Sequence, residues 1–211
     1  MTEVLLASRN TGKLLEMQRI LGEQMPDIRV LGLSEVEEYD EPAETEPTFE
    51  GNALIKARAA VAATGLPSLA DDSGLCVDAL NGMPGVLSAR WSGTPNSSGV
   101  DIDRANNQLL LAQLSDVPDV RRGAQFRCAV AFVYPVGCGE VMEHVVHGVM
   151  PGAVIREMRG AGGFGYDVVF VADGHAKTSA ELPAEEKDAI SHRGRALREI
   201  APTVTEVLTW L

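Results

Sequence analysis

The chain opens with a strand, a helix and a second strand in close succession, and this order restricts the fold more than any other feature. Residues 2–7 are almost continuously apolar, which predicts a buried strand. Residues 12–22 carry an apolar stripe that predicts an amphipathic helix, and residues 28–33 predict the second strand. The stripe consists of Leu14, Leu15, Met17, Ile20 and Leu21. The β-α-β order indicates an α/β protein.

Later segments predict further helices and an antiparallel hairpin. Thr48 can cap a helix that runs to Thr64, with Gly65 as its stop signal. Residues 101–114 predict another helix, and residues 184–211 predict polar turns followed by a helical C-terminus. Residues 125–134 and 140–149 are long β-rich runs around a probable turn at 135–139. No linker or internal repeat divides the chain, so we expect a single domain over residues 1–211 with a mixed sheet.

The charge balance restricts the partners. The 211 residues include 30 Asp and Glu against 18 Lys and Arg, for a net charge of -12. This excess of acid argues against an extended nucleic-acid or anionic-membrane surface, but it permits a local basic pocket for a small phosphate ligand. No apolar stretch approaches the roughly 20 residues that span a bilayer. The N-terminus lacks signal-peptide features, and three cysteines without C-x-x-C spacing indicate reduced thiols, so we expect a cytoplasmic protein.

Two adjacent carboxylates, Asp71 and Asp72, follow a short apolar run and precede a Ser-Gly pair. If the strand ends at Ser73, neighbouring side chains point to opposite faces, so only one Asp can face a given cleft. An acid at a strand end suits a metal ion or the activation of a water molecule. Taken alone, the stretch favours an Asp-Ser-Gly turn with solvated carboxylates.

The polar turn before the first helix is a candidate phosphate site. A helix N-terminus offers unpaired N–H groups and the positive end of a dipole. Ser8, Asn10, Thr11 and Lys13 add hydroxyl, amide and ammonium donors. The stretch is not a P-loop, because Ala7 and Leu14 stand where that motif needs Gly and Ser or Thr.

Residues 160–165 formally satisfy G-x-G-x-x-G, but the context excludes a dinucleotide fingerprint. A strand-like run follows these glycines, whereas the fingerprint follows a strand and opens a helix. The glycines still favour close backbone approach, and Phe164 and Tyr166 can stack on a base. Lys187, His192 and Arg193 form a possible donor cluster for phosphate or a base carbonyl. His144 and His147 do not make a convincing metal pair, because residues i and i+3 of a strand face opposite ways.

Six stretches, taken in order along nearly the whole chain, resemble the inosine triphosphate pyrophosphatase family. They are residues 8–13, 48–53 with Lys56 and Ala57, 70–75, 84–90, 162–167 and 191–194. The resemblance implies an elongated mixed sheet flanked by helices, with two lobes and an active-site cleft between them. It also implies Mg²⁺-dependent hydrolysis of ITP, dITP and XTP to the monophosphate and pyrophosphate, and a homodimer.

The resemblance assigns roles to particular residues. Asp72 matches the catalytic acid that binds metal and activates water, and Lys56 is the second catalytic candidate. The candidates for binding the triphosphate are Ser8, Arg9, Asn10, Thr11, Gly12 and Lys13. Ser73 is a further candidate for contact with the substrate. The candidates around the base are Phe164, Gly165, Tyr166, Asp167, Lys187, His192 and Arg193. Gly51 stands where the family often has Glu, so Glu50, Glu44 or another acid of the acidic loop must supply the second metal carboxylate. Among these we expect Glu44, the acid before Thr45, to bind the metal beside Asp72.

Two rival functions stay open from the sequence. A related fold acts on pyrimidine or modified nucleotides, and a preference for dTTP or UTP would reveal it. A regulator that binds the nucleotide without catalysis is the other alternative, and Gly51 keeps it open. Turnover of ITP that requires Mg²⁺ would exclude the regulator.

Overall fold

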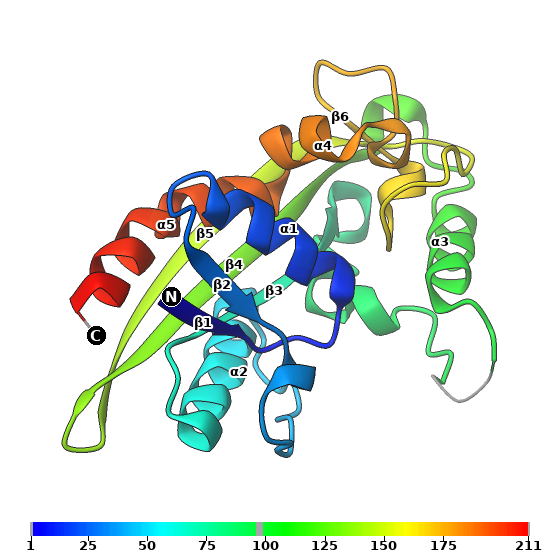
Figure 1. The fold of residues 1–211 in the computed structure, drawn as a ribbon. Coiled ribbons are helices and arrows are strands. Elements are labelled where there is room, and N and C mark those ends of the chain that lie inside the picture. The colour runs from blue at the N-terminus through cyan, green and yellow to red at the C-terminus, as the bar shows by residue number, and fades with distance from the viewer. Residues whose placement is uncertain (1, 96–98, 211) are drawn as a thin grey trace. The chain divides into compact units, whose positions relative to one another are not determined.

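The computed structural model describes residues 2–95 and 99–210 (Figure 1). The strands are β1 (Thr2–Leu6), β2 (Ile28–Leu31), β3 (Ser68–Val77), β4 (Gly123–Gly137), β5 (Glu140–Val154) and β6 (Phe170–Ala172). The α-helices are α1 (Thr11–Gly22), α2 (Phe49–Thr64), α3 (Ile102–Gln113), α4 (Ala184–Ile190) and α5 (His192–Trp210). Helices α1, α2 and α3 are capped by the preceding residues Asn10, Thr48 and Asp101, whose side chains each accept a backbone hydrogen bond.

The strands form one mixed sheet in the order β2-β1-β3-β4-β5-β6. Strand β1 pairs in parallel with β2 and β3, whereas β5 and β6 are antiparallel. The mixed α/β class expected from the sequence is therefore confirmed. The chain divides into two compact units, and β3, β4 and β5 each contribute residues to both.

Unit 1 comprises Met1–Asp72, Cys128–Gly148 and His192–Leu211. Alternate strand residues fill two hydrophobic clusters, as the two-residue period of a strand requires. Val4, Leu6 and Leu69 pack with residues of α1 and α5. Leu5 and Ala70 belong instead to the cluster that contains the alanines of α2. Unit 1 therefore has helices on both faces of its strands.

Unit 2 comprises Ser73–Arg127 and Val149–Ser191. Its core joins Leu75 and Val77 of β3 to Leu110 of α3 and to Phe126 and Phe170. Arg122 is buried within this unit and donates to the carbonyl oxygens of Leu114, Val154 and Ile155, at 2.6, 2.8 and 2.9 Å. These bonds satisfy carbonyl groups where α3 and β5 end.

The predicted end of the Asp-Asp strand is wrong. Strand β3 continues through Ser73 to Val77, because Gly74 serves a close approach rather than a turn. A Cβ on Gly74 would lie 2.3 Å from the carbonyl oxygen of Gly85 and 2.4 Å from Ser88 Oγ. The segment beyond the Asp pair is thus a buried strand of unit 2.

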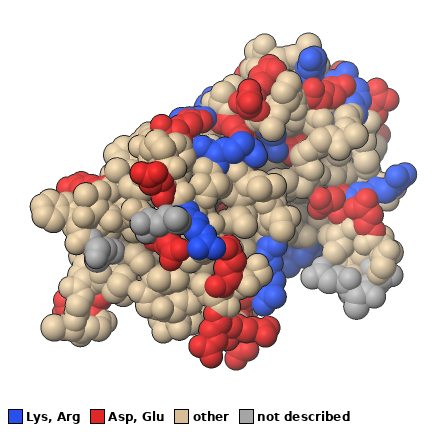
Figure 2. All heavy atoms as spheres, in the orientation of Figure 1, with Lys and Arg blue, Asp and Glu red and all other residues tan. Residues whose placement is uncertain are grey.

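The surface carries both signs of charge. On the face drawn in Figure 2, Lys and Arg side chains are interspersed with Asp and Glu side chains. Among the described residues, no helix is both long enough and apolar enough to cross a membrane.

Candidate active site

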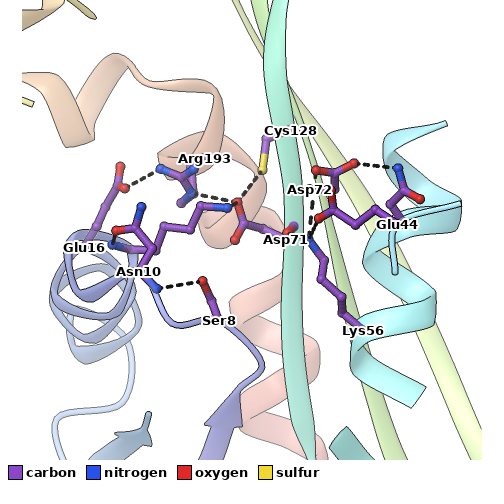
Figure 3. Close-up of polar contacts among 11 residues, drawn as sticks. Ser8, Asn10, Glu16, Glu44, Lys56, Asp71, Asp72, Cys128 and Arg193 are labelled. Carbon is purple, nitrogen blue, oxygen red and sulfur yellow. Dashed lines mark hydrogen bonds and ion pairs between the residues drawn. The ribbon is translucent and has the colours of Figure 1, made fainter. Parts of the chain in front are cut away.

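Asp71 and Asp72 point to opposite sides of β3 (Figure 3). Asp71 shares its side with Leu69, which packs against α1 and α5, whereas Asp72 shares its side with Ala70, which packs against α2. Both carboxylates are buried. The alternation predicted for these two residues is confirmed, and it gives each carboxylate its own set of partners.

Asp71 is the centre of a buried network of charges. Its Oδ2 lies 2.9 Å from Lys13 Nζ and 3.1 Å from Arg193 Nε. Arg193 Nη1 lies 2.6 Å from Glu16 Oε2, so two anions and two cations balance. Burial alone would raise the pKa of Asp71, but the charges of Lys13 and Arg193 hold it well below its usual range. The Cys128 thiol lies 4.0 Å from Asp71 Oδ2, and burial followed by that negative charge raises the pKa of the thiol.

Asp72 has a different environment. Its Oδ2 accepts a hydrogen bond from Asn52 Nδ2 at 3.1 Å, and its Oδ1 lies 3.9 Å from Lys56 Nζ. Burial raises the pKa of Asp72 to about 6, with Glu44 adding to the rise and Lys56 opposing it. A carboxylate with such a pKa is largely ionised at neutral pH yet binds protons more readily than an ordinary Asp. This property suits a general base.

Lys56 joins the acidic loop to strand β3. Its ammonium donates to Glu44 Oε1 and to the main-chain oxygen of Asp71, both at 2.7 Å. Burial would lower the pKa of Lys56, but the charges of Asp71, Asp72 and Glu44 raise it, so the ammonium stays charged. Lys56 therefore holds Glu44 of the acidic loop close to Asp72, although the two acids come from distant parts of the chain.

The donor set around Asp72 fits a magnesium ion. Mg²⁺ retains several waters and takes one or two protein carboxylates. Asp72 and Glu44 supply two carboxylates around one ammonium, and no group of three or more His, Cys, Asp or Glu with metal-site geometry occurs among the described residues. Asp72 and Glu44 are the carboxylates that would hold such an ion.

Gly51 stands at a crowded position. A Cβ there would lie 2.6 Å from the Cβ of Glu46, so the Glu46 side chain occupies the space that a larger residue would need. The neighbouring Glu50 carries an exposed carboxylate 3.8 Å from His147. Of the acids considered for the second carboxylate, Glu44 is the one that Lys56 holds beside Asp72.

The polar turn at Ser8–Lys13 leads from β1 into α1. Asn10 Oδ1 accepts from the backbone N–H of Lys13 at 3.1 Å, and Ser8 Oγ accepts from that of Asn10 at 3.2 Å. Thr11 and Gly12 form the first turn of α1, so their backbone N–H groups belong to its N-terminus. Ser8, Arg9, Asn10 and Thr11 line a cavity of ≈ 510 Å³, and Arg9 is paired with Glu41 at its rim.

The predicted base-binding residues fall in both units. Unit 2 brings together Phe164, Asp167 and Lys187, because Asp167 Oδ2 lies 2.9 Å from Phe164 N and 2.7 Å from Lys187 Nζ. The Lys187 ammonium also lies 4.9 Å from the centroid of the Phe164 ring. His192 and Arg193 begin α5 in unit 1, where both are buried, and Ser73 continues β3 into unit 2.

Two of the glycines near Phe164 serve contacts within the chain. A Cβ on Gly160 would lie 2.8 Å from the carbonyl carbon of Ala180, and one on Gly163 would lie 2.1 Å from Asp167 Oδ2. The glycines predicted that the backbone approaches another group closely at this point. The groups that it approaches are Ala180 and Asp167. Tyr166 is buried and donates to the carbonyl oxygen of Ser88 at 2.9 Å.

Sequence reasoning missed two residues of unit 1 that set the environment of the paired acids. Asn52 lies on α2 one turn before Lys56, and it joins Asp72 to the backbone N–H of Glu46. The signal that could have identified Asn52 is its position inside the stretch of residues 48–53, which resembles the family. Glu16 gave no signal, because a charged residue in the first half of an amphipathic helix is ordinarily solvated.

The chain is similar to known proteins over nearly its whole length. The model of the Ham1 family matches residues 4–203. A Frankia alni protein named dITP/XTP pyrophosphatase is 56% identical over 206 residues, covering 98% of each chain. A Nocardia farcinica protein of the same name is 57% identical over 205 residues, covering 97% of this chain and 95% of the relative.

Solved structures give the same result. A Mycobacterium abscessus nucleoside-triphosphatase named dITP/XTP pyrophosphatase has 54% identity and a TM-score of 0.73, covering 95% of this chain and 99% of its own. A HAM1 protein from Coxiella burnetii has 41% identity and a TM-score of 0.82, covering 98% and 100%. The resemblance drawn from the six sequence stretches is confirmed, and the chain belongs to the Ham1 family.

Proposed function

We propose that this protein hydrolyses the α–β phosphoanhydride of deaminated purine nucleoside triphosphates, namely ITP, dITP and XTP. The products are the nucleoside monophosphate and pyrophosphate, and the reaction cleanses the nucleotide pool. The observation that carries the proposal is the grouping of Asp72, Glu44 and Lys56 beside the pair of Asp71 with Lys13 from the α1 turn. The similar proteins from Frankia alni and Mycobacterium abscessus are named dITP/XTP pyrophosphatase, which supports the substrate class.

Asp72 and Glu44 would hold the Mg²⁺ ion. When bound, this ion neutralises part of the triphosphate charge and polarises the phosphoryl oxygens. A triphosphate carries about four negative charges, which an acidic protein must compensate locally. Lys13, Lys56 and the N-terminus of α1 supply positive charge for this purpose.

Asp72 acts as the general base in this proposal. Its carboxylate accepts a proton from a water molecule as the water oxygen attacks the α-phosphorus in line with the bridging oxygen. The bond from the α-phosphorus to that oxygen breaks, and pyrophosphate leaves with the electron pair. Asn52 fixes the orientation of the Asp72 carboxylate, and the Lys56 ammonium stabilises negative charge that develops nearby.

The base would be recognised through donors aimed at its 6-oxo group. Phe164 offers a ring for stacking, and the residue is 37% exposed. The Lys187 ammonium, held by Asp167, is a donor that an adenine amino group would leave unpaired. His192 and Arg193 remain predicted contributors to the same recognition.

A substrate panel tests the proposal. The protein is incubated with ITP, XTP, GTP, ATP and dTTP in the presence of Mg²⁺, and pyrophosphate and orthophosphate are measured separately. We expect pyrophosphate from ITP and XTP at rates well above those from ATP. Release of orthophosphate would exclude α–β cleavage, a preference for dTTP would favour the pyrimidine enzyme, and binding of ITP without turnover would favour a regulator.

We also propose that the chain forms a homodimer, as the family resemblance implied. In unit 1 the tip of the β4–β5 hairpin and the end of α5 expose the large apolar side chains of Val136, Val141, Met142 and Trp210. Such side chains favour a partner surface over solvent. Light scattering coupled to size-exclusion chromatography of the wild type and of Met142→Glu tests this, and a monomeric wild type would contradict it.

A further inference from the structure

Helix α3 carries two side chains that hold a single residue of the loop containing Phe164. Asp103 Oδ2 accepts a hydrogen bond from the backbone N–H of Gly165 at 2.7 Å. Asn107 Nδ2 donates to the backbone carbonyl of the same glycine at 2.8 Å. Because residues i and i+4 of a helix lie on one face, the two side chains bind Gly165 together.

The two hydrogen bonds from α3 hold Gly165 in an uncommon backbone conformation. Its φ is +62°, in the left-handed region that side chains rarely adopt. The two backbone groups of a surface turn ordinarily meet water, whereas both groups of Gly165 meet side chains of α3. The turn is thereby held in one backbone conformation by groups from another element.

Asn107 is itself held in place. The residue is 1% exposed, and its Nδ2 also donates to the carbonyl oxygen of Asp103 at 2.7 Å. Both acceptors lie on the Nδ2 side, which sets the orientation of the amide. The side chain therefore reaches Gly165 from a fixed position.

The neighbouring residue in the turn is Phe164. Its backbone N–H donates to Asp167 Oδ2 on one side, and its carbonyl carbon is bonded to the Gly165 nitrogen on the other. We propose that Asp103 and Asn107 are positioning residues that preorganise Phe164 for recognition of the purine base. This inference rests on the proposed function and deepens it, because it assigns base affinity to residues of α3 that do not touch the reacting phosphates.

The expected kinetic signature follows from the part of the substrate that is affected. Stacking on the base is equally available to the bound substrate and to the transition state, so its loss raises KM and leaves kcat unchanged. Removing one charged hydrogen bond to the turn should raise KM for ITP roughly tenfold. Inorganic triphosphate carries no base, so its inhibition constant should stay within about twofold of the wild-type value.

The experiment compares Asp103→Ala, Asp103→Asn, Asn107→Ala and the wild type, with Asp101→Ala as the matched control. Asp101 caps the same helix through the backbone N–H of Arg104, whereas the two hydrogen bonds to Gly165 come from Asp103 and Asn107. Asparagine keeps an acceptor oxygen, so Asp103→Asn should recover most of the wild-type KM. The measurements are kcat and KM for ITP, inhibition by inorganic triphosphate, and the melting temperature of each variant.

The outcomes separate the inference from the proposed function. A raised KM in Asp103→Ala and Asn107→Ala, with kcat and triphosphate inhibition retained and Asp101→Ala like the wild type, supports the inference. An unchanged KM in Asp103→Ala beside an active wild type overturns the inference alone. Equal losses in Asp101→Ala and Asp103→Ala also overturn it, because helix stability would then explain both. A wild type that does not turn over ITP overturns the proposed function and the inference with it.

Discussion

Asp71 and Asp72 are consecutive residues of β3, yet Asp71 is held between two cations while Asp72 lies near a second carboxylate with its pKa raised to about 6. The strand alternation causes this division, because it turns one side chain toward α1 and α5 and the other toward α2. The same alternation gives Asp71 compensating cations and leaves Asp72 with a raised pKa. The two should respond oppositely to the same substitution.

Asp72→Asn should abolish turnover while making the metal-free protein more stable at neutral pH. Loss of a general base costs about 10²- to 10⁴-fold in kcat. The pKa of Asp72 is raised from 3.8 to about 6, so the folded state binds the proton more tightly than the unfolded chain. Ionisation then destabilises the fold as pH rises through this window, by up to about 3 kcal/mol.

Urea unfolding in EDTA checks the second half of this prediction. At pH 7.5 the Asp72→Asn protein should have the larger free energy of unfolding, and at pH 4 the gain should shrink. The loss of an anion 3.9 Å from Lys56 works against the gain. A variant that is less stable than the wild type at pH 7.5, or one that retains normal turnover, would contradict the assignment.

Asp71→Asn should be strongly destabilising. Removing one member of a buried ion pair leaves the others uncompensated, and the cost is typically about 3–5 kcal/mol. Here Lys13 and Arg193 would lose the carboxylate that they share, while the ion pair of Arg193 with Glu16 would remain. The lowered pKa of Asp71 gives the matching pH dependence: its stabilisation is present above the ordinary Asp pKa and is lost as pH falls well below it. Urea unfolding at pH 7.5 should show the loss, and an unchanged midpoint would refute it.

The local elements could be predicted from the sequence because their signals are local. Thr48 and Gly65 mark the ends of α2, and Gly65 adopts the left-handed conformation that its role as a stop signal requires. The charge network could not be predicted, because Asp71 and Arg193 are 122 positions apart and each looks solvated within its own segment. Only the fold brings them together.

Gly74 shows a second limit. A Ser-Gly pair after an acid is typical of a turn, so the strand was predicted to end there. A glycine in a strand can also allow another backbone to approach closely. At Gly74 that backbone is Gly85, and no sequence pattern near Gly74 indicates where Gly85 lies. Glu44 is expected only because Gly51 departs from the family pattern, since an acidic loop carries no signal that separates one carboxylate from its neighbours.

The requirement for Mg²⁺ should increase in acid. A carboxylate must lose its proton to bind metal, so protons compete for Asp72 below its pKa of about 6. The half-saturating Mg²⁺ concentration for ITP turnover should be nearly constant from pH 7 to 8 and rise up to tenfold per pH unit below about 6. Titrations of Mg²⁺ at pH 5, 6, 7 and 8 measure it, and a constant value throughout would contradict the role of Asp72 in metal binding.

Glu44→Gln should weaken metal binding specifically. The substitution keeps the side-chain shape but removes the second carboxylate, and it should raise the half-saturating Mg²⁺ concentration roughly tenfold or more. Glu46→Gln is the matched control, because Glu46 lies on the same loop and packs against Gly51. Equal Mg²⁺ requirements in the two variants would show that Glu44 is not a metal ligand.

Asn52→Ala should shift the pH dependence as well as the rate. The hydrogen bond from Asn52 Nδ2 favours the ionised form of Asp72, so its loss should raise the pKa of Asp72 further. The acid limb of the kcat/KM profile should then move to higher pH by up to about one unit, with a roughly tenfold lower kcat at pH 7. Thr48→Ala is the control, because Thr48 caps the same helix through the backbone N–H of Gly51. If both variants lose activity without a shift of the acid limb, Asn52 merely stabilises α2. A shift confined to Asn52→Ala would identify Asn52 as the residue that positions the Asp72 carboxylate.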